Sequence, residues 1–284
     1  MGQITLMGRI PHTPEEVENS MVNVGMERIT TDNGSVRIDA DGLFYKDLNK
    51  LLRGVMLDYQ PEKIALYNVY GQRYIGTNLG REVKLEIFGT PGNDLGAFMD
   101  GPTIQVFGNA QDGCGNTMNS GEIIVHGNAG DIAGFSARGG EIFVKGNVGY
   151  RVGIHMKEYQ DKKPALVIGG TAQDFLGEYM AGGVLIVLGL GLNGDGHHKA
   201  NFIGTGMHGG VIYMRGRVEE HQLGKEVRDT ACRVSTDGND RDIIERYVSK
   251  FAKYFDYDAK DILGAEFTKL LPLSHRPYGR IYAY

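Results

Sequence analysis

One glycine recurs along the middle of the chain at a nearly constant spacing, and a short apolar segment precedes each copy. Successive copies are separated by 19, 19, 19, 23, 20 and 27 residues. The seven copies are Gly89, Gly108, Gly127, Gly146, Gly169, Gly189 and Gly216. A repeat of this length is typical of one supersecondary unit that stacks on its neighbours. We therefore expect a solenoid with these glycines at its structural turns, where a side chain is not tolerated.

The residues four and two positions before each glycine indicate that the repeating unit contains a strand. All fourteen are apolar and most are β-branched. The positions are Leu85, Ile104, Ile123, Ile142, Ala165, Leu185 and Ile212, and Ile87, Val106, Val125, Val144, Val167, Val187 and Met214. Coiled parallel strands keep one face apolar at a fixed period, whereas a sandwich of hairpins does not. We predict an all-β core, a right-handed single-stranded parallel β-helix of about seven turns.

Polar side chains recur just after the repeated glycines. Asn109, Asn128 and Asn147 follow three of them directly, and stacked asparagines can form a hydrogen-bonded ladder. Asp94, Asp112 and Asp131 stand four or five residues after successive glycines. We expect these aspartates to accept hydrogen bonds from turn amides. The alternative is a carboxylate row that binds Ca²⁺ or cleaves polysaccharide.

The outward positions of the strands change character along the solenoid. The position three before the glycine is Glu86 and then Gln105 in the first two units, and it is apolar in the units that follow, as at Phe143 and Ile186. An apolar outer face must be covered. We expect the chain's own flanks or another subunit, including a second copy of the chain, to cover it.

The flanks divide the chain into three predicted regions. Residues 1–64 form an N-terminal α/β flank and cap, residues 65–216 the glycine-repeat β-helix, and residues 217–284 a C-terminal helical flank. A capping box runs from Thr13 to Glu16 and predicts a helix start, and a second short helix is expected over 45–55.

Apolar residues at helical spacing predict two helices after the solenoid. Asn239 or Asp240 is expected to cap the first, and Asp258 the second. The second has a stripe that includes Phe267 and Leu271 and should end before Pro272. The tail over 278–284 is aromatic and could dock on a neighbour.

Bulk composition excludes several classes of function. The formal net charge of −5 argues against nucleic acid as the main partner. No stretch approaches 18 apolar residues and no leader is recognisable, so we expect a cytoplasmic protein without membrane contact. The chain has two cysteines, Cys114 and Cys232, and an iron–sulfur cluster needs about four thiolates.

The sequence contains no convincing set of catalytic residues. His197, His198 and His208 are weak metal candidates together with Asp195, since no HxH or HExxH spacing supports them. The glycine patterns at 189–194 and 204–209 match GxGxxG but are followed by another repeat rather than a helix. Cys114 has no predicted basic partner. We predict no catalytic, cofactor-binding or metal-binding residues in this chain.

Several glycine-containing segments of these repeats resemble a known family. The segments are YIG at 74–76, GNDLG at 92–96, GNAQD at 108–112, GNTMNSG at 115–121, and NFIGTGMHGG at 201–210. They are similar to the C-terminal β-helix domain of the glutamate synthase large subunit, in its stand-alone archaeal-type form. The resemblance covers about residues 65–216, and Pro102 departs from the usual glycine. One of the subunits of formylmethanofuran dehydrogenase shares such repeats.

The resemblance implies a structural role without catalysis of its own. In that family a glutamine amidotransferase releases ammonia, and an FMN and iron–sulfur protein uses it to make glutamate. The chain would brace these two partner subunits, and FMN and the Fe–S cluster would reside on the partners. Two alternatives are a scaffold in a formylmethanofuran dehydrogenase-like complex and a carbohydrate-active protein that uses the aspartate row.

Overall fold

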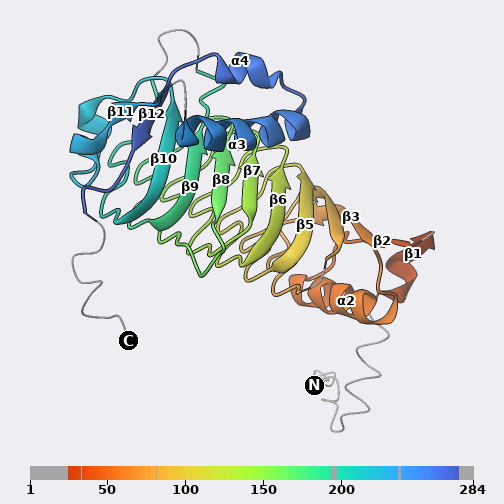
Figure 1. The fold of residues 1–284 in the computed structure, drawn as a ribbon. Coiled ribbons are helices and arrows are strands. Elements are labelled where there is room, and N and C mark those ends of the chain that lie inside the picture. The colour runs from red at the N-terminus through yellow and green to blue at the C-terminus, as the bar shows by residue number, and fades with distance from the viewer. Residues whose placement is uncertain (1–24, 33, 81, 193–196, 236–237, 275–284) are drawn as a thin grey trace, which may run out of the picture.

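The structure is a computed structural model that describes residues 25–32, 34–80, 82–192, 197–235 and 238–274. Its strands form one twelve-stranded sheet in the order β1 to β10, then β12 and β11. Strands β2 to β10 pair in parallel, each with the next along the chain, so the fold is a parallel β-solenoid (Figure 1). The parallel strands are β2 (Ser35–Asp39), β3 (Lys63–Tyr70), β4 (Lys84–Thr90), β5 (Asp100–Phe107), β6 (Ser120–Val125), β7 (Glu141–Val144), β8 (Ala165–Ile168), β9 (Ala181–Val187) and β10 (Gly209–Arg215).

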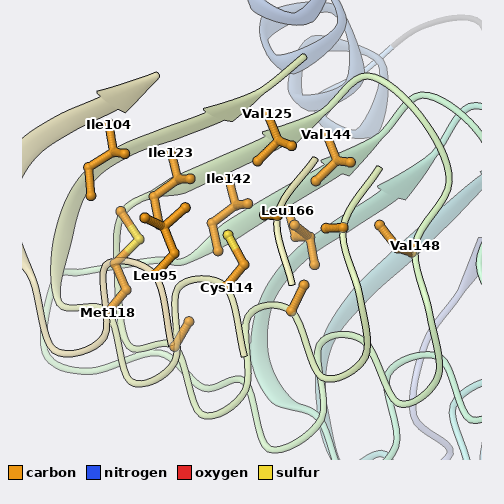
Figure 2. Packing of buried hydrophobic residues seen from close by; sticks show 14 of the residues in the cluster. Leu95, Ile104, Cys114, Met118, Ile123, Val125, Ile142, Val144, Val148 and Leu166 are labelled. Carbon is orange, nitrogen blue, oxygen red and sulfur yellow. The ribbon is translucent and has the colours of Figure 1, made fainter. Parts of the chain in front are cut away.

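The inside of the coil is a column of aliphatic side chains. Leu85 aligns with Ile104, Ile104 with Ile123, and Ile123 with Ile142 in the strand register. All fourteen predicted strand positions are buried, and twelve belong to this inner cluster. Figure 2 shows the column from close by, with residues of neighbouring strands aligned and side chains from the turns closing the other side. Like side chains thus stack on like, as the repeat predicts.

The fifth unit departs from the predicted register by one residue. Leu166 and Ile168 continue the inner column, because they align with Ile142 and Val144. Ala165 and Val167 point to the outer face, so the prediction that they face inward is wrong. The corner hydrogen bond to the Gly146 carbonyl comes from Gly170 at 2.9 Å, and Gly169 lies immediately before that position.

The N-terminal end of the solenoid begins earlier than the predicted boundary at residue 65. Strand β2 already pairs in parallel with β3, and β1 (Ile29–Asp32) pairs antiparallel with β2. Helix α2 (Tyr45–Asp58) occupies the region where residues 45–55 predict a helix. Its buried residues Leu48 and Leu52 belong to the inner cluster, so α2 closes the end of the column. The predicted capping box at Thr13 lies outside the described residues.

The C-terminal region returns over the solenoid. Helix α3 (Asn239–Phe255) lies across the outer face, as Figure 1 shows, and its N-cap is Gly238 rather than the predicted Asn239 or Asp240. Asp258 caps α4 (Ala259–Leu263) as predicted, through a bond from the Lys260 amide.

The predicted extension of α4 toward Leu271 is wrong. The chain instead forms β12 (Phe267–Leu270), which pairs antiparallel with β10 and with β11 (Cys232–Arg233). Three short 3₁₀ helices, η1 (Met26–Arg28), η2 (Glu220–Gln222) and η3 (Arg228–Thr230), complete the described elements. None of the described helices has the length and apolar character needed to cross a lipid bilayer.

Candidate functional site

The three histidines singled out from the sequence occupy different environments. His197 is exposed, whereas His198 is buried and donates a hydrogen bond from Nε2 to the Arg215 carbonyl at 2.9 Å. His208 is half-buried and donates from Nδ1 to the Gly206 carbonyl at 3.1 Å. Burial lowers the pKa of His198 and keeps its ring neutral.

These histidines do not assemble a metal centre in the part of the chain that the structure describes. No group of three or more His, Cys, Asp or Glu side chains there is arranged to hold a metal ion. Asp195, the fourth predicted member, lies outside the described residues. Binding of a metal by His197, His198 and His208 therefore receives no support from geometry.

The asparagine and aspartate rows are hydrogen-bonded ladders along the corners. Asn109 Oδ1 accepts from the Asn128 amide at 2.8 Å, and Asn128 Oδ1 accepts from the Asn147 amide at 2.8 Å. Asp112 Oδ1 accepts in the same way from the Asp131 amide at 2.9 Å. The predicted asparagine ladder is confirmed, and so is the role of Asp112 and of Asp131, which accepts from the Tyr150 amide at 2.8 Å, as acceptors for turn amides. Asp94 differs, because its Oδ1 accepts from the Asn116 side-chain amide at 2.9 Å.

The other motifs considered in the sequence are parts of the fold. Cys114 is buried in the inner cluster, and burial raises the pKa of its thiol to about 12. A thiol with so high a pKa is a poor nucleophile. After the GxGxxG match at 204–209 the chain enters strand β10, not the helix that a dinucleotide site requires.

A cluster of aromatic and basic side chains on the turns is the most distinctive exposed surface. We call it the aromatic turn patch; it consists of Phe135, Arg151, His155, Phe175, Tyr179 and Phe202. The Phe175 and Phe202 rings stack at 4.9 Å, and the Arg151 guanidinium lies 5.5 Å from the Phe175 ring centre. His155 stacks on Tyr179 at 5.4 Å. Phe202 and Tyr179 are 52% and 46% exposed, so the rings face solvent.

The backbone at this patch is left-handed where side chains are large. Phe175 has φ 64°, Phe202 φ 56°, Tyr179 φ 51°, and Arg151 and His155 both have φ 55°. Left-handed backbone costs a residue with a Cβ roughly 1 kcal/mol, and glycine or asparagine adopts it more readily. Aromatic residues at these exposed turns are therefore not explained by the stability of the fold.

Sequence reasoning missed this patch, although a signal was present. A second glycine recurs in the turns, and in the later units it is represented by Gly177 and Gly204. Phe175 and Phe202 stand two residues before these glycines, and Tyr179 stands two after Gly177. Aromatic residues at a fixed offset from a turn glycine indicate a column of exposed rings.

A second aromatic surface runs along the outer face of the sheet. Tyr67 stacks on Phe88 at 4.6 Å, Phe88 on Phe107 at 4.8 Å, and Phe107 on His126 at 4.9 Å. The column then meets the edge of Phe255 on α3 at 5.2 Å. Tyr67 and Phe107 remain 36% and 39% exposed.

Helix α3 divides this outer face into a covered part and an open part. At its N-terminal end Asp240 accepts a hydrogen bond from the Tyr213 hydroxyl on β10, and at its C-terminal end Phe255 reaches His126 after β6. Between them, α3 covers the apolar residues Phe143 and Ile186. The predicted cover for the apolar exterior is thus the chain's own helix, whereas β3 to β5 are not covered by it (Figure 1).

Comparisons with known proteins agree with this architecture. A family model described as the GXGXG motif matches residues 64–273. The uncharacterized protein MJ1350 of Methanocaldococcus jannaschii is 46% identical over 270 residues, which cover 91% of this chain and 97% of that protein. A chain of the formyltransferase/hydrolase complex FhcABCD from Methylorubrum extorquens, solved with methylofuran, has a similar fold. The TM-score is 0.52 at 17% identity, over 85% of this chain and 92% of that one.

Proposed function

This chain belongs to the GXGXG-motif family, that of the glutamate synthase C-terminal domain, and we propose that it is a non-catalytic structural subunit of a glutamate synthase-type complex. In this proposal it braces a glutamine amidotransferase subunit and an FMN and iron–sulfur subunit. The assembly would serve glutamate biosynthesis and nitrogen assimilation. The single observation that carries a bracing role is the aromatic turn patch.

The composition of the patch is that of a protein–protein interface. Aromatic residues and arginine are enriched where partners bury surface. Aromatic rings bring a large contact area at a small cost in side-chain entropy, and arginine brings several hydrogen-bond donors and stacks on such rings. Phe202 is 52% exposed and Tyr179 is 46% exposed, so a partner that covers these rings would remove a large apolar area from water. The left-handed backbone at both residues supports a role in binding rather than in folding.

The redox groups of such a complex fit on the partners better than on this chain. An iron–sulfur cluster takes about four thiolates, and the sequence contains two cysteines. Cys114 is enclosed in the inner column, while Cys232 is exposed on β11. We propose that FMN and the cluster are supplied by the oxidoreductase subunit.

A second candidate is the analogous scaffold of a formylmethanofuran dehydrogenase-like complex. The observation that favours it is the similarity of fold to a chain of FhcABCD, a formyltransferase/hydrolase complex. At 17% identity this similarity concerns the fold. In both candidates the chain binds catalytic subunits through the same turns, and they differ in the chemistry of those subunits.

Co-purification from the native host distinguishes the two candidates. The chain is tagged, purified at low salt, and its stoichiometric companions are identified by mass spectrometry and by visible absorption. Glutamate synthase-type assembly predicts an amidotransferase together with a protein whose visible spectrum shows both flavin and an iron–sulfur cluster, and glutamine-dependent glutamate formation by the complex. Companions that carry formyltransferase or formyl-hydrolase activity without flavin would replace the first candidate by the second. A chain that purifies alone from the native host contradicts both.

A further inference from the structure

We propose that the open outer sheet docks an acidic amphipathic helix of a partner subunit. The open outer sheet is the uncovered face of β3 to β5, formed by Lys63, Tyr67, Lys84, Phe88 and Phe107. This inference rests on the proposed function, since a scaffold that braces two subunits needs a second surface besides the aromatic turn patch. It states the chemistry of the occupant, which family membership does not give.

The open outer sheet continues an interface already present in the molecule. The aromatic column runs without interruption from Tyr67 to His126, and α3 begins to cover it at His126 through Phe255. The outer face of the sheet is therefore covered by α3 from β10 to β6, and the same face is uncovered over β3 to β5. A second helix laid end to end with α3 would cover Tyr67, Phe88 and Phe107.

Helix α3 pairs basic side chains with acidic side chains of the sheet that it covers. Glu122 and Glu141 occupy aligned positions at the start of β6 and β7, next to each other in the register. Lys250 of α3 lies 2.5 Å from both carboxylates, and Arg246 lies 3.2 Å from Glu141. The covering helix thus places basic residues over an acidic row and apolar residues over the centre of the sheet.

The row of aligned residues that holds Glu122 and Glu141 is basic where it crosses the open outer sheet. Lys63 and Lys84 align with each other in β3 and β4, and the row continues through Thr103 to Glu122. Both lysines contact Glu86 at 2.8 Å, and two cations there share one carboxylate. Their side chains remain 41% and 47% exposed. A helix that pairs with the open outer sheet as α3 pairs with its own part must place acidic residues over Lys63 and Lys84. It must place apolar residues over the aromatic rings.

The test uses two matched peptides and the full chain. One probe is a fluorescein-labelled peptide with the sequence of residues 239–255. The other differs only by Arg246→Glu and Lys250→Glu, so that the acidic residues fall where α3 has basic ones. Binding is followed by fluorescence anisotropy at low salt. We expect the acidic peptide to bind about tenfold more tightly, as expected for two ion pairs at a half-exposed surface. The preference should shrink in 0.5 M salt, which reduces the Debye length to below about 5 Å.

Charge reversal on the scaffold gives the decisive comparison. The Lys63→Glu/Lys84→Glu variant should prefer the unmodified peptide, and the milder Lys63→Gln/Lys84→Gln variant should lose the preference if the first fails to fold. Tyr159→Asn, which removes a 49% exposed ring outside both surfaces, is the control and should bind like the wild type. Equal binding of the two peptides, or a preference that persists in the glutamine variant, overturns the proposal.

A photo-crosslinking amino acid at position 107 in the isolated full chain identifies other occupants. Crosslinks to residues 1–24 of the same chain, or between two copies, would show that the surface is already filled and overturn a partner helix. The absence of such crosslinks supports it. Because neither assay uses the enzymes of a glutamate synthase, their failure leaves the proposed function standing. Failure of the co-purification in turn leaves the peptide result intact.

Discussion

Lys250 on α3 lies 2.5 Å from Glu122, a residue of β6 that is 128 positions earlier in the chain. The same ammonium reaches Glu141 on the next strand at 2.5 Å, and the Tyr254 hydroxyl donates to Glu122 at 2.8 Å. This contact fixes the C-terminal helix on the outer face. It adds to the apolar packing of α3 on the sheet, in which Phe143 and Ile186 share a buried cluster with Phe251.

The Lys250 contact predicts a loss of stability at alkaline pH. Burial of the ammonium lowers the pKa of Lys250, because it disfavours the charged form. The hydrogen bonds to Glu122 and Glu141 favour the charged form more strongly, so the pKa of Lys250 is raised overall. A raised lysine pKa contributes stability below the unfolded value of about 10.4, and this is lost as pH rises through the folded value. Burial and Glu122 also raise the pKa of Tyr254 to about 12, so this hydroxyl likewise loses its contribution to stability as the pH rises. Urea unfolding at several pH values should show stability falling at alkaline pH. The loss begins at pH ~9, because the pKa of the buried Cys114 thiol is also raised, and Lys250 and Tyr254 add to it above pH ~10.

Substitution of Lys250 isolates this contact. Lys250→Gln should lower the free energy of unfolding at pH 8 by about 1–2 kcal/mol, because two adjacent carboxylates lose their shared cation. The same substitution should also reduce the fall in unfolding free energy above pH ~10. Lys253→Gln, on the exposed side of the same helix, is the control. Identical urea midpoints for both variants at pH 8 would refute the role of Lys250.

Gly127 is predicted to tolerate no side chain. A Cβ atom there would lie 2.2 Å from Asn109 Oδ1 and 2.7 Å from the Gly108 carbonyl oxygen, so the asparagine ladder would have to break. Gly127→Ala should cost about 1–3 kcal/mol of unfolding free energy. Gly191→Ala is the matched control, because nothing lies within 4 Å of its added Cβ. If thermal melts of the two variants coincide, the corner is not as tight as described.

The aromatic turn patch predicts a separation of stability from binding. Phe202→Asn relieves left-handed backbone, which offsets the loss of stacking on Phe175, worth about 1 kcal/mol. The urea midpoint should therefore stay within about 1 kcal/mol of wild type while partner binding weakens at least about tenfold. Tyr59→Asn removes a 45% exposed ring at the end of α2, outside both proposed surfaces, and should change neither property. A large loss of stability in Phe202→Asn with normal binding would assign the ring to the fold.

The two cysteines should differ in reactivity. Cys114 is fully buried with its pKa raised to about 12, whereas Cys232 is exposed. A thiol reagent such as dithionitrobenzoate at pH 8 should titrate one thiol per native chain and two after unfolding in guanidinium. Rapid reaction of two thiols in the native chain would show that the inner column is open near Cys114.

The repeat predicts the inner column because it has one buried face. Leu85 and Ile87 alternate with more polar neighbours, so the inward face can be identified from the sequence. In β8 the alternation disappears: Ala165, Leu166, Val167 and Ile168 are all buried, some by the column and some by α3. The sequence therefore contains no signal for which pair points inward, and the extra residues before β8 shift the register.

The parts that sequence analysis misses depend on contacts between distant segments. Phe267 and Leu270 have a spacing compatible with a helix, but β10 offers an edge 50 or more residues earlier and β12 pairs with it. The aromatic turn patch is assembled from successive turns, and its members look like unrelated surface residues until the coil aligns them. Both features depend on how distant segments of the chain are brought together by the coil, and the local residue pattern does not contain that information.

The most direct measurement of the bracing role is the ratio of glutamate formed to glutamine hydrolysed by the reconstituted amidotransferase and flavoprotein, with and without this chain. Hydrolysis of glutamine alone leaves one glutamate, and reductive use of the released ammonia adds a second. A brace that takes no part in catalysis should therefore raise this ratio from one toward two while leaving each isolated half-reaction unchanged, and the Phe202→Asn variant should fail to raise it. A ratio that does not respond to the chain, or a half-reaction that requires it, would contradict the account.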